Sequence, residues 1–243
     1  MIKELEGIIV SVRDYSETSQ IINIITKDNG IVGAIAKGSK SMKSNLRSTT
    51  DKLTYGLFNL YYKEDKLSTL TSVDVIDNFK NIKTDIEKIS YATFLLELTE
   101  QVIKQSENTA IYPLLINALI KINEGYDPMV ITNIVELKYL AYLGVMPKLD
   151  GCSICDSKVL IKTLSSDLGG YVCANCYKNE VMVDEKTIKL IRMYLYVDIA
   201  KISKLDVSDK PKKEINTFLD DYYEKYTGLY LKSKSFLKTL SQL

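Results

Sequence analysis

The four cysteines of the chain form two Cys-x-x-Cys pairs, Cys152/Cys155 and Cys173/Cys176, separated by 17 residues. A Cys-x-x-Cys turn directs two sulfur atoms at one point, so two such turns can surround a metal ion with four thiolates. The length of the intervening loop is typical of zinc sites. Four sulfur ligands leave no open position for water or substrate, so we expect one structural Zn²⁺ ion per chain.

Disulfide bonds, a redox centre and an iron site compete with zinc as roles for the four cysteines. Disulfides require an oxidising compartment, and nothing in the sequence indicates one. A redox centre needs only one Cys-x-x-Cys pair, usually at the start of a helix beside a βαβ unit, and no such unit is predicted. Iron fits the same four-sulfur arrangement, because ligand geometry alone does not separate it from zinc. A bound metal therefore remains the favoured interpretation, with zinc preferred to iron.

A second stretch with chemical potential runs from Lys37 to Thr50. It contains four cations and no acidic residue, and small hydroxyl residues lie between the cations: Lys37, Lys40, Lys43 and Arg47. Lysine, arginine and hydroxyl side chains all donate hydrogen bonds to phosphate oxygens. A solvated polar loop would have a similar composition. On an OB-like barrel, whose open face and loops commonly bind oligonucleotides, we favour contact of these four side chains with phosphates.

The usual equipment of an enzyme is missing from the sequence. There is no histidine, so the commonest general base is absent, and neither a Gly-x-x-x-x-Gly-Lys-Ser/Thr loop nor a Gly-x-Gly-x-x-Gly motif occurs. The expectation is therefore a protein that is not an enzyme. The net charge is +1, so affinity for nucleic acid must come from local clustering of cations. The first residues lack an apolar signal region, and no apolar run approaches the ~20 residues of a membrane span, so we expect a cytoplasmic protein.

Two types of periodicity divide the chain near residue 80. Before it, β-branched and alternating residues predict five short strands: Leu5–Tyr15, Gln20–Thr26, Ile31–Ala36, Tyr55–Tyr62 and Leu67–Ile76. The second and third are joined by Asp28-Asn29-Gly30, for which we predict a turn with positive φ at Asn29 and Gly30. Five short strands with a long loop after the third suit a small Greek-key barrel, and the OB-fold is the preferred candidate. An SH3-like barrel has a similar pattern.

After residue 80 the apolar residues recur with helical spacing. We expect helices around 91–102 and 111–122, with a stop at Gly125, and another opened by Asp127-Pro128. Helices resume near Asp184 and, after a polar break at Asp209-Lys210-Pro211, end in a long helix. The basic tail from Leu229 is predicted to be solvated or to make an auxiliary phosphate contact.

The predicted organisation is thus α+β. It comprises an OB-fold DNA-binding domain at 1–80 and a helical domain at 81–243, with a four-cysteine zinc module inserted at 148–182. Between the cysteine pairs, Asp167 and two glycines predict the tight turn that brings the second pair back to the first.

Several stretches, in this order, resemble the RecO family of bacterial recombination mediators. They are Asp14–Ser19, Gly30–Lys40, Glu136–Pro147, the two cysteine pairs with Gly169-Gly170, and Leu231–Leu237. Each piece is short, but together they span nearly the whole chain. The basic loop departs from the family pattern because it holds mainly lysine where arginine is frequent. Point-charge contact with phosphate is therefore expected more than bidentate contact.

The resemblance implies an OB-fold joined to a helical domain with a zinc module. It implies binding of single- and double-stranded DNA and annealing of complementary strands. With RecR, the protein would load RecA onto DNA coated by single-stranded-DNA-binding protein, whose acidic C-terminal tail the helical domain would capture. The implied location is the bacterial cytoplasm, at the nucleoid during repair, and participation of RecF is left open. The alternative from the residues alone is a zinc-containing adaptor that assembles proteins without binding DNA.

Overall fold

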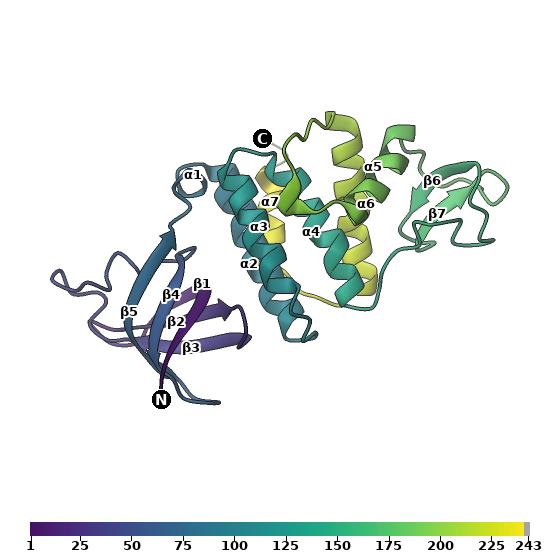
Figure 1. Cartoon of the computed structure of the whole chain (residues 1–243). Coiled ribbons are helices and arrows are strands. Elements are labelled where there is room, and N and C mark those ends of the chain that lie inside the picture. The colour runs from purple at the N-terminus through teal and green to yellow at the C-terminus, as the bar shows by residue number, and fades with distance from the viewer. Residues whose placement is uncertain (241–243) are drawn as a thin grey trace. The chain divides into compact units, whose positions relative to one another are not determined.

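The computed structural model describes residues 1–240 and shows a five-stranded barrel followed by helices and a small two-stranded module (Figure 1). The barrel strands are β1 (Ile2–Asp14), β2 (Gln20–Thr26), β3 (Ile31–Ala36), β4 (Tyr55–Tyr61) and β5 (Ser68–Asp77). All five lie close to the predicted ranges. The α+β class is therefore confirmed.

The barrel closes in the order β1-β2-β3-β5-β4. The first half of β1 pairs antiparallel with β4, and its second half pairs antiparallel with β2. Strand β3 meets β5 in parallel at Ala34–Ser68 and Ile35–Thr69, which completes the ring. A long first strand shared by two neighbours and a parallel β3–β5 closure give the OB-fold topology, as predicted from the strand pattern.

Two glycines allow β1 to bend where it passes from one neighbour to the other. Gly7 pairs with Thr26 on one side and with Gly56 on the other. A Cβ at Gly7 would lie 2.6 Å from Ile24 Cγ2, and one at Gly56 would lie 2.5 Å from the carbonyl oxygen of Asp74. The strands approach so closely here that only glycine fits.

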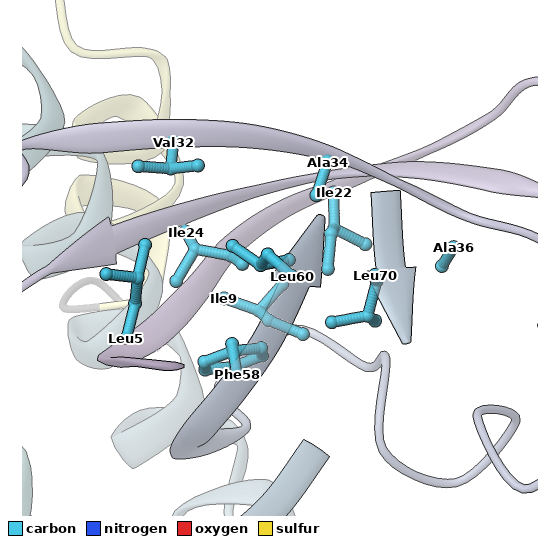
Figure 2. Packing of buried hydrophobic residues seen from close by; sticks show 10 residues of the cluster. All are labelled: Leu5, Ile9, Ile22, Ile24, Val32, Ala34, Ala36, Phe58, Leu60 and Leu70. Atoms are coloured by element: carbon cyan, nitrogen blue, oxygen red, sulfur yellow. The ribbon is translucent and has the colours of Figure 1, made fainter. Parts of the chain in front are cut away.

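The barrel interior is filled by the inward-facing residues of all five strands, as Figure 2 shows. Ten of them are buried: Leu5, Ile9, Ile22, Ile24, Val32, Ala34, Ala36, Phe58, Leu60 and Leu70. Leu46 of the loop between β3 and β4 packs against this cluster. The alternation of strand residues thus determines the core.

The hairpin between β2 and β3 differs in one detail from its predicted form. Only Gly30 has a positive φ, of 60°, and Asn29 does not. The Oγ1 of Thr26 accepts a hydrogen bond from Asn29 N and donates one to the carbonyl oxygen of Gly30. The threonine hydroxyl closes a wider loop than a two-residue Asn-Gly turn.

The helices begin and end at recognisable signals. They are α1 (Lys80–Lys83), α2 (Ile86–Ile103), α3 (Ile111–Asn123), α4 (Pro128–Tyr142), α5 (Glu185–Tyr196), a 3₁₀ turn at Ile199–Lys201, α6 (Asp209–Tyr226) and α7 (Lys232–Leu240). Asp127 caps α4 by accepting from Met129 N and Val130 N, and Gly125 has a φ of 100° just past α3. The polar residues from Asp209 form the first turn of α6 and do not separate two elements.

By its internal contacts the chain divides into two compact units, residues 1–123 and 124–243. The first contains the barrel with α1, α2 and α3. In the second, α4, α5 and α6 pack together, and strands β6 (Ile161–Ser165) and β7 (Gly170–Cys173) form an antiparallel hairpin between the two cysteine pairs. Within residues 1–240, no helix is both long and apolar enough to cross a bilayer.

Candidate metal centre and nucleic-acid interface

The four cysteines lie on two similar backbone turns. In the first, Cys152 N donates to Ser157 O, and Asp156 N donates back to Cys152 O. In the second, the amides of Cys176 and Tyr177 both donate to Cys173 O. Each turn directs its two sulfur atoms inward, and the β6–β7 hairpin brings the two turns together. The predicted turn between the strands is present, with φ values of 75° at Gly169 and 150° at Gly170.

The sulfur atoms converge on one point. All four lie within 4.8 Å of one another, and the Sγ atoms of Cys155 and Cys173 are 3.6 Å apart. A tetrahedral ion with metal–sulfur bonds of about 2.3 Å needs sulfur–sulfur distances of about 3.8 Å. The cysteines are unbridged, and their donor set fits a soft divalent metal. They can therefore hold a metal ion.

Two of the four thiols, those of Cys152 and Cys176, have shifted pKa values. Burial raises the pKa of Cys152, but backbone amides, first that of Cys173, outweigh burial and lower this pKa to about 6. Hydrogen bonding to Cys155, followed by burial, raises the pKa of Cys176 to about 12. The pKa values of Cys152 and Cys176 are thus shifted in opposite directions. A divalent cation at the centre would favour the thiolate form of its cysteine ligands.

Two contacts hold the β6–β7 hairpin, one with the segment between α4 and Cys152 and the other with α6. Gly170 lies against Lys148, whose N donates to Gly169 O and whose O accepts from Tyr171 N. A Cβ at Gly170 would overlap the carbonyl oxygen of Lys148, so this approach requires glycine. At the hairpin tip, Lys225 Nζ lies 2.6 Å from Asp167 Oδ1. The module therefore has a defined position on the second unit.

The basic loop between β3 and β4 is anchored at both ends. Near its start, Gly38 N donates to Ser19 Oγ and Lys40 N donates to Thr18 O, which ties the loop to the β1–β2 turn. Near its end, Leu53 N donates to Ile9 O. The middle is a series of turns in which Ser41, Ser44 and Arg47 each donate to the residue three positions before. Lys40 and Lys43 occupy the same third position of two successive turns.

All four predicted DNA-binding residues, Lys37, Lys40, Lys43 and Arg47, are exposed on this one loop. One of them has an acidic partner that the loop sequence does not reveal. Lys40 Nζ lies 2.9 Å from Asp14 Oδ2 at the end of β1, and its hydrogen bond lowers the pKa of Asp14. Both groups are on the surface, so a phosphate can displace the aspartate.

Two further exposed side chains lie near the basic loop. Arg13 is near the end of β1, and Tyr15 is in the β1–β2 turn that the basic loop contacts. Their exposure beside a cationic loop was not predictable without the tertiary hydrogen bonds.

The expectation of a solvated basic tail is wrong for Lys234. Its side chain is 16% exposed and its Nζ lies 3.2 Å from Glu136 Oε1 and 2.8 Å from Asp220 Oδ1. The side chain of Lys238 and residues 241–243 lie outside the described part of the chain. The Glu136 side chain is 2% exposed, and no helical periodicity identifies a buried carboxylate with a lysine partner 98 positions away.

The fold and the cysteine site define a protein in which an OB barrel with a basic loop precedes helices that carry a four-cysteine module. Family models described as Recombination protein O N terminal and C terminal match residues 1–79 and 83–235. A protein named DNA repair protein RecO from Listeria monocytogenes is 33% identical over 244 residues, covering 99% of this chain and 95% of its own length. One of the same name from Bacillus velezensis is 32% identical over 247 residues, covering 100% and 96%. The chain belongs to the RecO family, and its role is in DNA repair and recombination.

Proposed function

We propose that the chain is a non-enzymatic recombination mediator that binds single- and double-stranded DNA and anneals complementary strands. The observation that carries this proposal is the anchored loop on the OB barrel that presents Lys37, Lys40, Lys43 and Arg47 to solvent. OB barrels commonly bind oligonucleotides through their open face and loops. Membership of the RecO family supports the same role.

Annealing follows from the kind of contact these side chains make. Two complementary strands repel each other through their phosphates, and lysine and arginine reduce that repulsion. Phosphate contacts leave the base edges free, so a bound strand can still pair with its complement. The process needs no hydrolysis of nucleotides. Binding should tolerate any sequence and weaken as salt concentration rises.

The proposed partners follow from the same role. In this scheme the protein acts with RecR to load RecA onto single strands coated by single-stranded-DNA-binding protein, and the helical unit captures the tail of that coating protein. We further infer that the four cysteines hold zinc. The metal would supply folding energy to the module and no chemistry on the substrate, because the four sulfurs leave no open position.

The loop can be tested through the salt dependence of DNA binding. Each phosphate contact on a single strand contributes about −0.7 to the slope of log K against log salt. Replacing Lys37 and Lys43 together by alanine should weaken binding to all sequences alike and flatten the slope by about 1.4. Fluorescence anisotropy of a labelled oligonucleotide at several salt concentrations measures both quantities.

A matched control removes two lysines that pair with acids on their own helices. Lys104 pairs with Glu100 at 2.9 Å, and Lys189 pairs with Glu185 at 2.6 Å. Alanine at both positions should leave the slope unchanged. If the wild type, the Lys37/Lys43 variant and the Lys104/Lys189 control had equal slopes of log K against log salt, the loop would not be part of the DNA site. If the wild type did not bind DNA at moderate salt, the adaptor function would be favoured.

A further inference from the structure

The turn between β1 and β2 is fixed against the basic loop. Tyr15 N donates to Ser19 O, which closes the turn on itself. Ser19 Oγ accepts from Gly38 N, and Thr18 O accepts from Lys40 N, so two hydrogen bonds join the turn to the start of the loop. In OB-folds the connection between the first two strands is one of the loops that bind oligonucleotides. The turn and the basic loop therefore form one surface at this end of the barrel.

The barrel contains four tyrosines, and Tyr15 is the one that combines an exposed ring with a position beside the basic loop. Tyr15 is 59% exposed. The Tyr55 hydroxyl is committed to a hydrogen bond with Glu6 Oε1, at 2.8 Å, and Tyr62 is half-buried against the barrel core. Tyr61 is 53% exposed, but it pairs with the first residue of β1, whereas Tyr15 follows the last one.

The outer face of β1, β2 and β3 adjoins this turn. Arg13, Ile21 and Ile35 pair across the three strands and form one row of side chains. The adjacent residues Ile22 and Ala34 point into the barrel, as Figure 2 shows, so the row faces outward. Arg13 is exposed and the two isoleucines are half-buried. This face therefore offers apolar contact and a guanidinium group beside the aromatic ring of the turn.

Cations outnumber acids around Tyr15. Residues 13–19 and 37–50 contain five cations and two acids: Arg13, Lys37, Lys40, Lys43, Arg47, Asp14 and Glu17. Asp14 pairs with Lys40 at 2.9 Å. With that pair taken as neutral, four cations remain against one carboxylate. The surroundings of the exposed ring thus favour a polyanion that also carries flat apolar groups, as a single DNA strand does.

We propose that Tyr15 stacks on an unpaired base of a DNA strand whose phosphates contact the basic loop, so that this surface prefers single strands to duplexes. The inference rests on the DNA binding proposed above for the loop. Phosphates are present in single strands and duplexes alike, but a duplex keeps its bases stacked and paired. Every base has a π face, so stacking on tyrosine adds affinity for single strands without selecting a sequence.

The test compares the wild type with Tyr15→Ala by fluorescence anisotropy, on a labelled single strand and on a duplex of the same length. The variant should bind the single strand about tenfold more weakly and the duplex within about twofold of the wild type. The slope of log K against log salt should not change, because tyrosine neutralises no phosphate. Tyr15→Phe keeps the ring and should retain the affinity for single strands.

The matched control is Tyr61→Ala, which removes a similarly exposed ring from the other end of β1 and should keep the affinity for single strands within about twofold. A second readout does not depend on the folding of a variant. Irradiation of the wild-type protein with a single strand that contains iodouracil should crosslink the base to Tyr15, as mapped by mass spectrometry.

Four results would overturn the inference while the wild type still binds the single strand. They are equal weakening on single strand and duplex by Tyr15→Ala, a loss below about twofold, an equal loss in Tyr61→Ala, and crosslinks that do not include Tyr15. If the wild type bound neither the single strand nor the duplex, the proposed function would fail and this inference with it.

Discussion

Within residues 1–240, the structure shows one ammonium group beside the buried carboxylate of Glu136, that of Lys234. Replacing Lys234 with methionine would remove it. Lys234 on α7 contacts Glu136 of α4 and Asp220 of α6, and its Nζ lies 5.1 Å from the ring centre of Tyr223. Burial raises the pKa of Glu136 even with this lysine present. Burial also disfavours the Lys234 ammonium, but the two carboxylates outweigh it and raise the pKa of Lys234.

The Lys234→Met variant should have a lower free energy of unfolding, because the substitution leaves the Glu136 carboxylate buried without its partner. Breaking a buried ion pair on one side typically lowers the free energy of unfolding by about 3–5 kcal/mol, and the lower end of about 3 kcal/mol applies because the Lys234 side chain is still 16% exposed. Glu136→Gln should cost less, because Lys234 keeps Asp220 at 2.8 Å. The double variant should be more stable than the sum of the two single effects predicts, by about 1–3 kcal/mol.

Urea denaturation of the wild-type, single and double variants measures these differences, with Lys186→Met on the exposed surface of α5 as the control. That control should lie within about 0.5 kcal/mol of the wild type. The sign of the pH dependence is also determined. An acid with a raised folded pKa is destabilising when ionised, so the deficit of Lys234→Met should shrink as pH falls from about 8 to about 5. A loss below about 1 kcal/mol, with no coupling to Glu136 and no pH dependence, would refute the reasoning.

Three further predictions concern the DNA loop and the cysteine module. Asp14→Asn removes the acidic partner of Lys40, so DNA affinity should rise. The slope of log K against log salt, measured by fluorescence anisotropy, should steepen by up to about 0.7. An unchanged slope would mean that Lys40 does not contact phosphate. Cys152→Ser should abolish metal binding and unfold the module, because metal binding supplies its folding energy; wild-type thermal stability in a metal-free variant would contradict this. Gly170→Ala forces a Cβ against Lys148 O and should lower the melting temperature and metal content together, whereas a normal metal content would show that the contact can relax.

The barrel was predictable because its strands follow simple local rules. β-Branched residues and alternation set the strands from β1 to β5, and the inward residues of that alternation form the core. The OB topology needed one more step, since the parallel pairing of Ala34 with Ser68 joins residues that no local pattern connects. Helix caps were equally local: Asp127 and Asp184 each cap the helix that follows them.

The cysteine cluster was predictable from spacing, because two Cys-x-x-Cys turns can meet in few ways. The ion pairs of the lysines, in contrast, were not predictable from the sequence. The pairing of Lys40 with Asp14 and of Lys234 with Glu136 joins residues 26 and 98 positions apart, so composition assigned both lysines to solvent or phosphate.

The central proposal, that this chain is a recombination mediator, is tested most directly by annealing of complementary oligonucleotides coated with the cognate single-stranded-DNA-binding protein, in the absence of nucleotide. The proposal predicts annealing faster than the uncatalysed rate, with the Lys37→Ala/Lys43→Ala variant slower than the wild type at equal protein concentration. No acceleration by the wild type, with or without RecR, would contradict the proposed function.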